Sequence, residues 1–154
     1  MPISLPAIAA AFACLFTVSQ AAAAPCTEAN SIAKIRNTAH GGYEYVVFDF
    51  IKPPALPAFV VETGKPPFTM DPSGEPVAVK GAKFRVIKFR NIGWMCDIRE
   101  AFTLPRRAVK DIKKLEQFEG YITYVVGYGA AARFRGAYSY DAGPYTKIVL
   151  RFRR

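Results

Sequence analysis

Apolar and polar positions alternate along most of this chain, and this pattern predicts a series of short β-strands. In residues 118–128, both alternating sets of side chains are largely apolar or aromatic. A strand of this kind is covered on both of its faces. Gly120 and Gly127 bracket the stretch, where a turn or a close backbone approach is expected. We therefore predict a central strand here, with Glu119 as a turn residue and no chemistry of its own.

Further strands are predicted on both sides of this stretch. Residues 43–51 present Val46, Phe48 and Phe50 to one side, and Glu44 stands at the beginning. Pro- and Gly-rich turns separate the other predicted strands, which are residues 58–62, 76–79, 83–90, 132–140 and 145–153. This pattern predicts one all-β domain, a single β-sandwich or a partly closed β-barrel of short antiparallel strands.

The strand at residues 83–90 changes its apolar phase. Phe84 and Val86 alternate first, and Ile87 and Phe89 then alternate in the opposite phase. One extra residue at that point is the mark of a β-bulge. Such a bulge would keep the basic residues of this strand on one side: Lys83, Arg85, Lys88 and Arg90.

Residues 109–115 have two interpretations. Val109, Ile112, Leu115 and Phe118 are spaced by three, and Pro105 could open a helix. The segment could equally be an irregular edge strand whose charges resist aggregation. Spacing alone favours the helix, whereas the surrounding strand pattern and the family resemblance given below favour the strand.

The beginning of the chain resembles an export signal. Residues 3–24 carry no charged side chain and end in four alanines, and cleavage after Ala23 keeps Pro25 away from the scissile bond. An uncleaved anchor is the alternative, because about 20 apolar residues can span a bilayer. We predict a signal peptide over residues 1–23 and a periplasmic or secreted protein. A lead-in over residues 24–39, with a short helical turn near residues 30–34, would precede a β domain over residues 40–154.

Export changes the meaning of the cysteines. Cys14 leaves with the signal, so Cys26 and Cys96 remain in an oxidising compartment and predict one structural disulfide. A redox or metal site is the alternative. There is no Cys-x-x-Cys motif and His40 is the single histidine, so we predict no metal and no cofactor.

The composition favours a packed domain with anionic partners. Hydrophobic residues make up 51% of the chain and aromatic residues 14%, which argues against disorder. Lys and Arg outnumber Asp and Glu by 21 to 12, for a formal charge of +9. Outside the cytoplasm this charge favours anionic lipids or cell-wall polymers, and nucleic acid is not expected. The alternative is that the charge only keeps the domain soluble.

Several segments together resemble the AMIN-like domain family, and through it the AMIN domains that accompany N-acetylmuramoyl-L-alanine amidases. The segments are GYEYVVFDF at residues 42–50, PSGEPV at 72–77, FEGYITYVVGY at 118–128 and the closing strand at 144–152. Their order and spacing carry the resemblance, which covers about residues 40–153. It implies a small exported β-fold of the envelope, non-catalytic in the manner of AMIN domains, which localise enzymes to cell-wall or septal sites.

The chain departs from the family pattern at four positions. Tyr45 stands where the family often has Arg, and Gln117 where it often has Asp. Lys147 replaces an Arg of the last strand, and Arg151 replaces an acid and so reverses a charge.

Catalytic chemistry has little support in the sequence. Glu44 and Glu119 are the one carboxylate pair that we considered for glycoside hydrolysis, which requires two acids at a defined separation. His40 beside two glycines is better explained as a turn residue, and no phosphate loop or metal-ligand spacing occurs. We predict a protein that is not an enzyme.

The remaining candidates are basic and aromatic side chains that could bind carboxylates, phosphates or sugar rings. If their strands lie in one sheet, they form a polyanion- or glycan-binding face; otherwise each is an ordinary solvated residue. They are Lys83, Arg85, Lys88, Arg90, Arg133, Arg135, Arg151, Arg153, Tyr121, Tyr138 and Tyr140.

The function that this pattern predicts is an exported, non-catalytic β domain that binds an anionic envelope polymer such as peptidoglycan, or an envelope protein. Two alternatives stay open: a small envelope hydrolase or its accessory subunit, and a β-barrel that binds a small apolar ligand. Contact with the membrane is expected only if the N-terminal segment is not cleaved.

Overall fold

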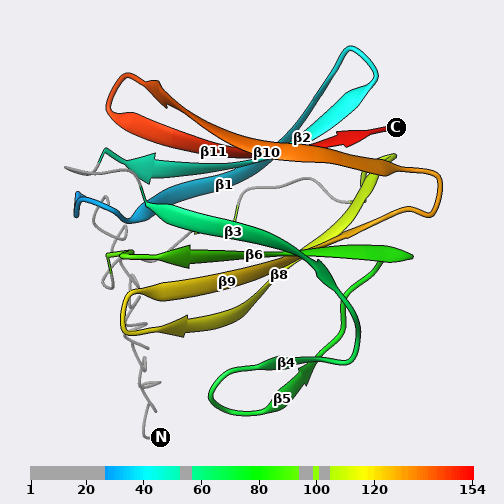
Figure 1. The fold of residues 1–154 in the computed structure, drawn as a ribbon, viewed down its shortest axis with the longest axis horizontal. Helices are drawn as coiled ribbons and strands as arrows, with labels where there is room; N and C mark the ends of the chain where they lie inside the picture. Colours follow the sequence, from blue (N-terminus) through cyan, green and yellow to red (C-terminus); the bar gives the residue numbers. More distant parts are fainter. Residues whose placement is uncertain (1–26, 53–56, 94–98, 101–104) are drawn as a thin grey trace, which may run out of the picture.

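The computed structural model describes residues 27–52, 57–93, 99–100 and 105–154, which form two packed sheets without closing into a barrel (Figure 1). Sheet A contains, in spatial order, β10 (Arg133–Ala142), β11 (Tyr145–Arg153), β2 (Tyr43–Ile51), β1 (Ile32–His40) and β7 (Arg99–Glu100). Sheet B contains β3 (Ala58–Gly64), β6 (Lys83–Arg90), β9 (Tyr121–Tyr128) and β8 (Val109–Phe118). The all-β sandwich predicted from the sequence is confirmed.

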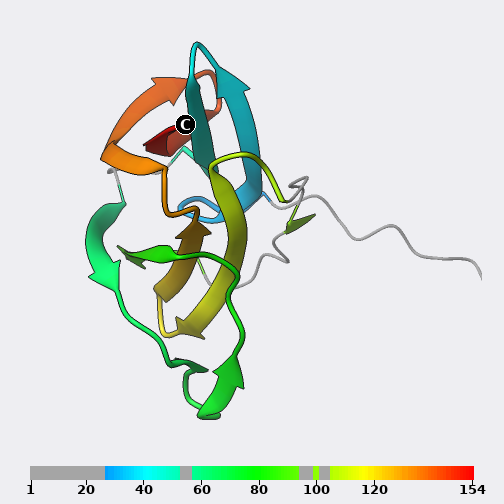
Figure 2. The ribbon, with the colours of Figure 1, turned by 90° about the vertical axis from the view of Figure 1, so that its right-hand side faces the viewer.

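Pairing is antiparallel within both sheets, except that the short β7 runs parallel to β1. A small hairpin of β4 (Phe68–Met70) and β5 (Glu75–Val77) extends beyond sheet B, as Figure 2 shows. Within the described residues, no helix has the length and hydropathy needed to span a membrane. The predicted signal segment, Cys26 and Cys96 lie outside the described residues.

The main core fills the space between the two sheets with aromatic and aliphatic side chains. Phe48 of β2 and Phe89 of β6 meet with their ring centroids 5.0 Å apart, and Tyr124 of β9 lies 5.4 Å from Phe48. All three side chains are fully buried. Burial of a large side chain of this kind contributes about 2–3 kcal/mol, so these contacts hold the two sheets together.

A second core lies on the outer side of sheet B, and it explains the change of phase in β6. Phe84 and Val86 pack there against Phe68 of the hairpin, whereas Ile87 and Phe89 enter the main core. The register of β6 with both of its neighbours is continuous. The predicted β-bulge is therefore wrong, because a strand with a core on each side needs no extra residue to bury both apolar phases.

β8 is a strand with two register shifts, and these shifts allow apolar residues spaced by three to be buried without a helix. Its register shifts between Val109 and Asp111, which brings both Val109 and Ile112 into the main core. A second shift, at Leu115, turns that side chain into the second core, and its carbonyl accepts a hydrogen bond from the backbone N–H of Asp71. The strand favoured by the resemblance is confirmed, and the helix indicated by the spacing is not formed.

β9 confirms the prediction of a strand covered on both faces. Every residue of β9 after Tyr121 is buried. The turn before it contains Glu119 and Gly120, with positive φ values of 44° and 81°, which confirms Glu119 as a turn residue. At Gly127, a Cβ atom would collide with the carbonyl oxygen of Lys80, in the segment that leads from the hairpin to β6. This is the close backbone approach that the glycine predicted.

The predicted helical turn near residues 30–34 is wrong. β1 begins at Ile32 and pairs with β2 along its length. Ile32 and Ile35 enter the main core, since one shift of register between Ile32 and Lys34 restores the alternation. Tertiary burial thus overrides the weak local signal of the sequence.

Glu44 joins the two sheets through its carboxylate. It is 1% exposed, and its carboxylate oxygens accept hydrogen bonds from the backbone N–H groups of Ala108, at 2.9 and 3.0 Å, and Val109, at 2.8 Å. A buried carboxylate is tolerated where backbone donors surround it. Glu44 therefore fixes the beginning of β8 against β2.

Candidate functional site

The outer face of sheet A gathers tyrosines and cations. Ile148, Leu150 and Phe152 of β11 enter the main core, so the residues between them point outward. The register of β11 with β10 and β2, and of β2 with β1, places further side chains beside them. We call the outward set the tyrosine–arginine face: Lys34, Arg36, Tyr43, Tyr45, Arg133, Tyr138, Tyr140, Tyr145, Lys147, Arg151 and Arg153.

The tyrosines of this face form two ordered pairs, one with exposed and one with half-buried rings. Tyr138 and Tyr140 stack with ring centroids 6.2 Å apart and 23° between their planes, and they are 44% and 46% exposed. Tyr43 and Tyr45 lie with ring centroids 6.3 Å apart. The Arg151 guanidinium sits 5.3 Å from the centroid of the Tyr43 ring, a cation–π contact that orders both groups.

Asp49 is the one carboxylate on this face among the described residues, and Arg36 occupies it. The Arg36 Nε and Nη2 atoms donate to the two carboxylate oxygens at 2.8 and 3.1 Å. This hydrogen bonding raises the pKa of the Arg36 guanidinium above its ordinary value, against the opposing effect of burial. The other cations of the face form no ion pair within the described part of the chain.

Asp141 lies on β10, the edge strand of sheet A, opposite Thr146 of β11. Its carboxylate also has partners within the protein. Thr146 donates a hydrogen bond to it at 2.8 Å, and Lys52 lies 3.0 Å away. The Thr146 hydrogen bond, and then that of Lys52, lower the pKa of the Asp141 carboxyl below its usual range. Among the described side chains, the face thus presents no free carboxylate that would repel an anion.

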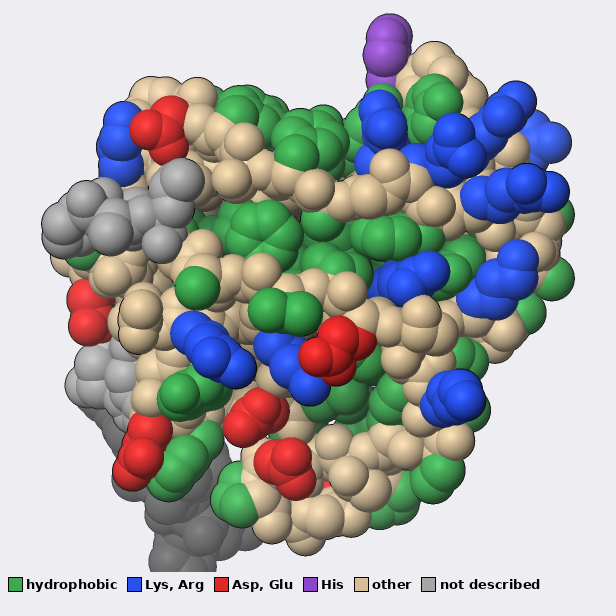
Figure 3. All heavy atoms as spheres, viewed as in Figure 1, with side chains coloured by type: hydrophobic (Ala, Val, Ile, Leu, Met, Phe, Trp, Pro, Cys, Tyr) green, Lys and Arg blue, Asp and Glu red, His purple; other side chains and the backbone are tan. Residues whose placement is uncertain are grey.

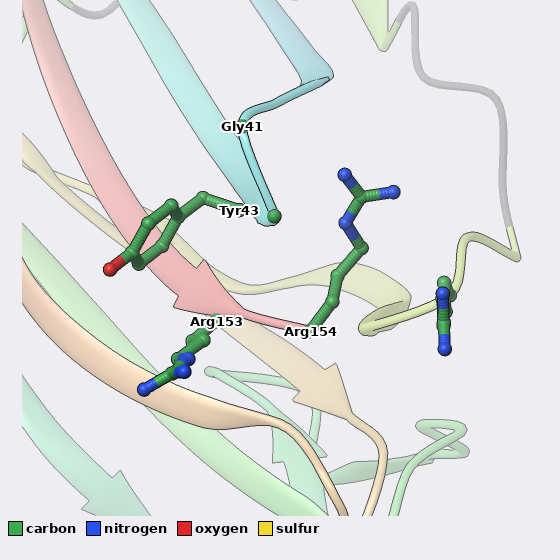
Figure 4. Close-up of a pocket in the computed structure, with 6 residues that line it drawn as sticks. Gly41, Tyr43, Arg153 and Arg154 are labelled. Atoms are coloured by element: carbon green, nitrogen blue, oxygen red, sulfur yellow. The ribbon is translucent and has the colours of Figure 1, made fainter.

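An open pocket of about 520 Å³ lies at the end of sheet A, where β1 turns into β2 and β11 ends (Figure 4). Figure 4 shows Arg153 and Arg154 leaving the end of β11 in different directions, Arg154 on the same side as the Gly41 turn and Arg153 away from the Tyr43 ring. The backbone N–H of Arg154 donates to the Gly42 carbonyl at 3.0 Å, which fixes the end of the chain against the turn. The lining residues are Gly41, Gly42, Tyr43, Arg107, Arg153 and Arg154.

Charge is distributed unevenly over the molecule. In Figure 3, Lys and Arg side chains gather at the upper right, at the end where Figure 1 places the C-terminus, and most of the visible Asp and Glu lie lower down. The acids outside sheet A belong largely to sheet B, its turns and the hairpin: Glu62, Asp71, Glu75, Asp111, Glu116 and Glu119. This asymmetry orients the tyrosine–arginine face toward a polyanion.

The structure divides the predicted site residues between the two sheets. Arg133, Tyr138, Tyr140, Arg151 and Arg153 come together on the tyrosine–arginine face. Arg135 lies beside them, in a β-bulge of β10 with Gly136 opposite Arg151. The remaining candidates belong to sheet B, so the eleven residues do not share one sheet: Lys83, Arg85, Lys88, Arg90 and Tyr121.

The four cations of β6 lie on two sides of sheet B, and each has a partner within the protein. Lys83 donates to the Ala130 carbonyl at 2.6 Å, and Arg85 donates to the Thr63 hydroxyl at 2.6 Å and covers the Phe134 ring at 4.7 Å. On the opposite side, Lys88 pairs with Glu62 at 2.8 Å, and Arg90 lies 5.9 Å from the centroid of the Tyr121 ring. These contacts fit structural roles at the sheet edges.

The predicted site residues did not include several members of the site: Lys34, Arg36, Tyr43, Tyr45, Tyr145, Lys147, Arg107 and Arg154. Lys34 was placed in the predicted helical turn and Arg36 in the lead-in, which hid their outward positions on a strand. Tyr43 and Tyr45 alternate with the buried Glu44 and Val46. The strand pattern could therefore have identified both tyrosines as outward-facing residues. Arg107 had no signal, because it precedes β8 and reaches the pocket only through the tertiary fold.

The described residues contain no arrangement for catalysis by the considered acids or by a metal. Glu44 contacts the beginning of β8, and Glu119 follows its end ten residues later, a separation of about 30 Å along a strand. The pair considered for glycoside hydrolysis is therefore excluded. No group of three His, Cys, Asp or Glu residues that could hold a metal ion occurs in the described part of the chain.

Comparison with known proteins gives one match. The family model of the AMIN-like domain matches residues 30–150. No curated protein and no solved structure matches the chain. The matched range includes β1 and the first two thirds of β11, and so covers both sheets.

Proposed function

The chain belongs to the AMIN-like domain family, and from this premise we propose that it is a non-catalytic binding domain of the cell envelope. Its ligand is an anionic envelope polymer such as peptidoglycan, held on the tyrosine–arginine face. The family supports an envelope domain. The choice of this face rests on the chemistry of its side chains.

One observation carries the proposal: exposed tyrosine rings and arginines without a carboxylate partner lie on one face, and its single carboxylate among the described residues is already bound by Arg36. Guanidinium groups bind carboxylates and phosphates in a bidentate geometry. Tyrosine rings present flat apolar surfaces with a polar tip, which suit the faces of sugar rings. A glycan with anionic substituents satisfies both kinds of group.

A pull-down on purified peptidoglycan tests the charged part of the face. We expect the Arg151→Glu/Arg153→Glu variant to bind at least about tenfold more weakly, because two charge-assisted contacts become repulsive. Lys88→Glu/Arg90→Glu is the matched control, since it changes the charge equally but lies on sheet B. Binding of the wild type should weaken with salt. An equal loss in both variants would show that net charge alone is responsible and would reject the assigned face.

The stacked tyrosines give a second, independent prediction. Replacing Tyr138 and Tyr140 with alanine should weaken binding of soluble peptidoglycan fragments by about fivefold per ring, since each aromatic contact contributes about 1 kcal/mol. Tyr121→Ala is the control, because Tyr121 is 47% exposed but belongs to sheet B. Isothermal titration calorimetry gives the affinities. Unchanged affinity in the Tyr138→Ala/Tyr140→Ala variant would remove sugar stacking from the proposal.

A further inference from the structure

The pocket at the end of sheet A has an unusual excess of positive groups. Three of its six lining residues are arginines, and Arg107, Arg153 and Arg154 are all exposed. None of them forms an ion pair within the described residues, and no acidic side chain lines the pocket. The three arginine side chains therefore bring three positive charges that no acidic side chain of the lining offsets, since arginine does not lose its proton at physiological pH.

The backbone adds donors to the same pocket. Gly41 and Gly42 form the turn between β1 and β2, with φ values of +55° and +82°. Neither N–H group has an acceptor among the described residues, whereas the Gly42 carbonyl is occupied by the N–H of Arg154. Both glycines line the pocket, so their N–H groups are candidate donors to an anion there.

The charge of the pocket matches a phosphoryl group better than a carboxylate. A carboxylate has one negative charge and is satisfied by one bidentate guanidinium. A phosphate monoester carries about −1.5 to −2 charges and three acceptor oxygens, so it can engage several guanidinium and backbone donors together. Exposed arginine side chains change rotamers within nanoseconds, so the three guanidinium groups can close on such a group.

We infer that this pocket binds a phosphate monoester of the envelope component that lies against the tyrosine–arginine face. The inference rests on the proposed function, because Tyr43 and Arg153 belong to both the face and the pocket. Two sources share this chemistry: an envelope polymer that carries phosphate monoesters, and the headgroup of a phospholipid such as phosphatidic acid at the same surface.

Amide NMR with inorganic phosphate tests the pocket itself. At constant ionic strength, phosphate should produce saturable shifts at Gly41 and Gly42, and acetate should bind at least about tenfold more weakly. Arg107→Gln/Arg153→Gln/Arg154→Gln should abolish the shifts. Arg133→Gln is the matched control, because Arg133 pairs with Arg153 on the neighbouring strand but does not line the pocket. An equal response to acetate, or shifts that persist in the triple variant, would overturn the inference.

Binding to two kinds of surface identifies the source. One arm compares a cell-wall polymer that carries phosphate monoesters with the same polymer stripped of these phosphates by a phosphatase. The other compares vesicles that contain phosphatidic acid, a phosphate monoester, with phosphatidylcholine vesicles. At least tenfold weaker binding to the stripped polymer supports a polymer phosphate, and selective binding to the anionic vesicles supports a lipid headgroup.

The failures of the two proposals are distinguishable in the same experiment. Equal binding to the stripped and untreated polymer, without vesicle binding, would contradict the phosphoryl pocket and leave the proposed function intact. Saturable phosphate shifts without binding to either form of the polymer would support the pocket and contradict the proposed polymer ligand.

Discussion

Replacing Glu44 with alanine is expected to lower the free energy of unfolding by about 3 kcal/mol, because two buried backbone N–H groups lose their acceptor. The Glu44 carboxylate accepts from Ala108 and Val109, and it is 1% exposed, so water does not readily replace it. The substitution also leaves a cavity between β2 and the beginning of β8. Urea unfolding followed by tryptophan fluorescence or circular dichroism measures the change.

Two further variants test the assigned mechanism. Glu44→Gln keeps the shape and one acceptor oxygen, so we expect a smaller loss, about 1–2 kcal/mol. Glu62→Gln removes an exposed carboxylate paired with Lys88, for which the expected change is about 0.5 kcal/mol or less. If Glu44→Ala were as mild as Glu62→Gln, the carboxylate would not be what fixes β8 to β2.

The strands that lie under a single core were the most predictable part of the fold. The predicted bounds of β2 and β11 agree with the structure, since each strand alternates a buried apolar set with an outward set. β6, and β8 at Leu115, contradicted simple alternation for one reason. The hairpin of β4 and β5 forms a second core on the outer side of sheet B, so apolar residues of both phases are buried. The local sequence of β6 and β8 does not predict this long-range contact with the hairpin.

The site was predictable only in part, because side-chain chemistry does not reveal the sheet to which a strand belongs. Arg85 and Arg151 both alternate with apolar residues, yet Arg85 covers Phe134 between the sheets and Arg151 covers Tyr43 on an outer face. The pocket also requires the β1–β2 turn and Arg107 to meet the end of β11. Such contacts depend on strand order, which alternation leaves undetermined.

Gly127→Ala is the second change for which we expect a large effect, about 3 kcal/mol of lost stability. The new Cβ would meet the carbonyl oxygen of Lys80, a backbone atom that no change of rotamer can move. The segment around Lys80 would have to withdraw from β9. This would disturb the hydrogen bond from its N–H to Asp111 and that from the Ala82 N–H to the Tyr128 carbonyl. Val79 of the same segment would lose its packing in the second core.

Gly129→Ala provides a control two residues away. Its Cβ would meet the Lys110 Cε atom at 3.4 Å, the far end of a flexible side chain, and Gly129 does not have a positive φ. We therefore expect a change between neutral and a gain of about 0.5–1 kcal/mol, since alanine restricts the unfolded chain. Thermal and urea unfolding of both variants measure the contrast. If both variants were destabilised equally, the loss could not be assigned to the contact between residue 127 and the Lys80 carbonyl.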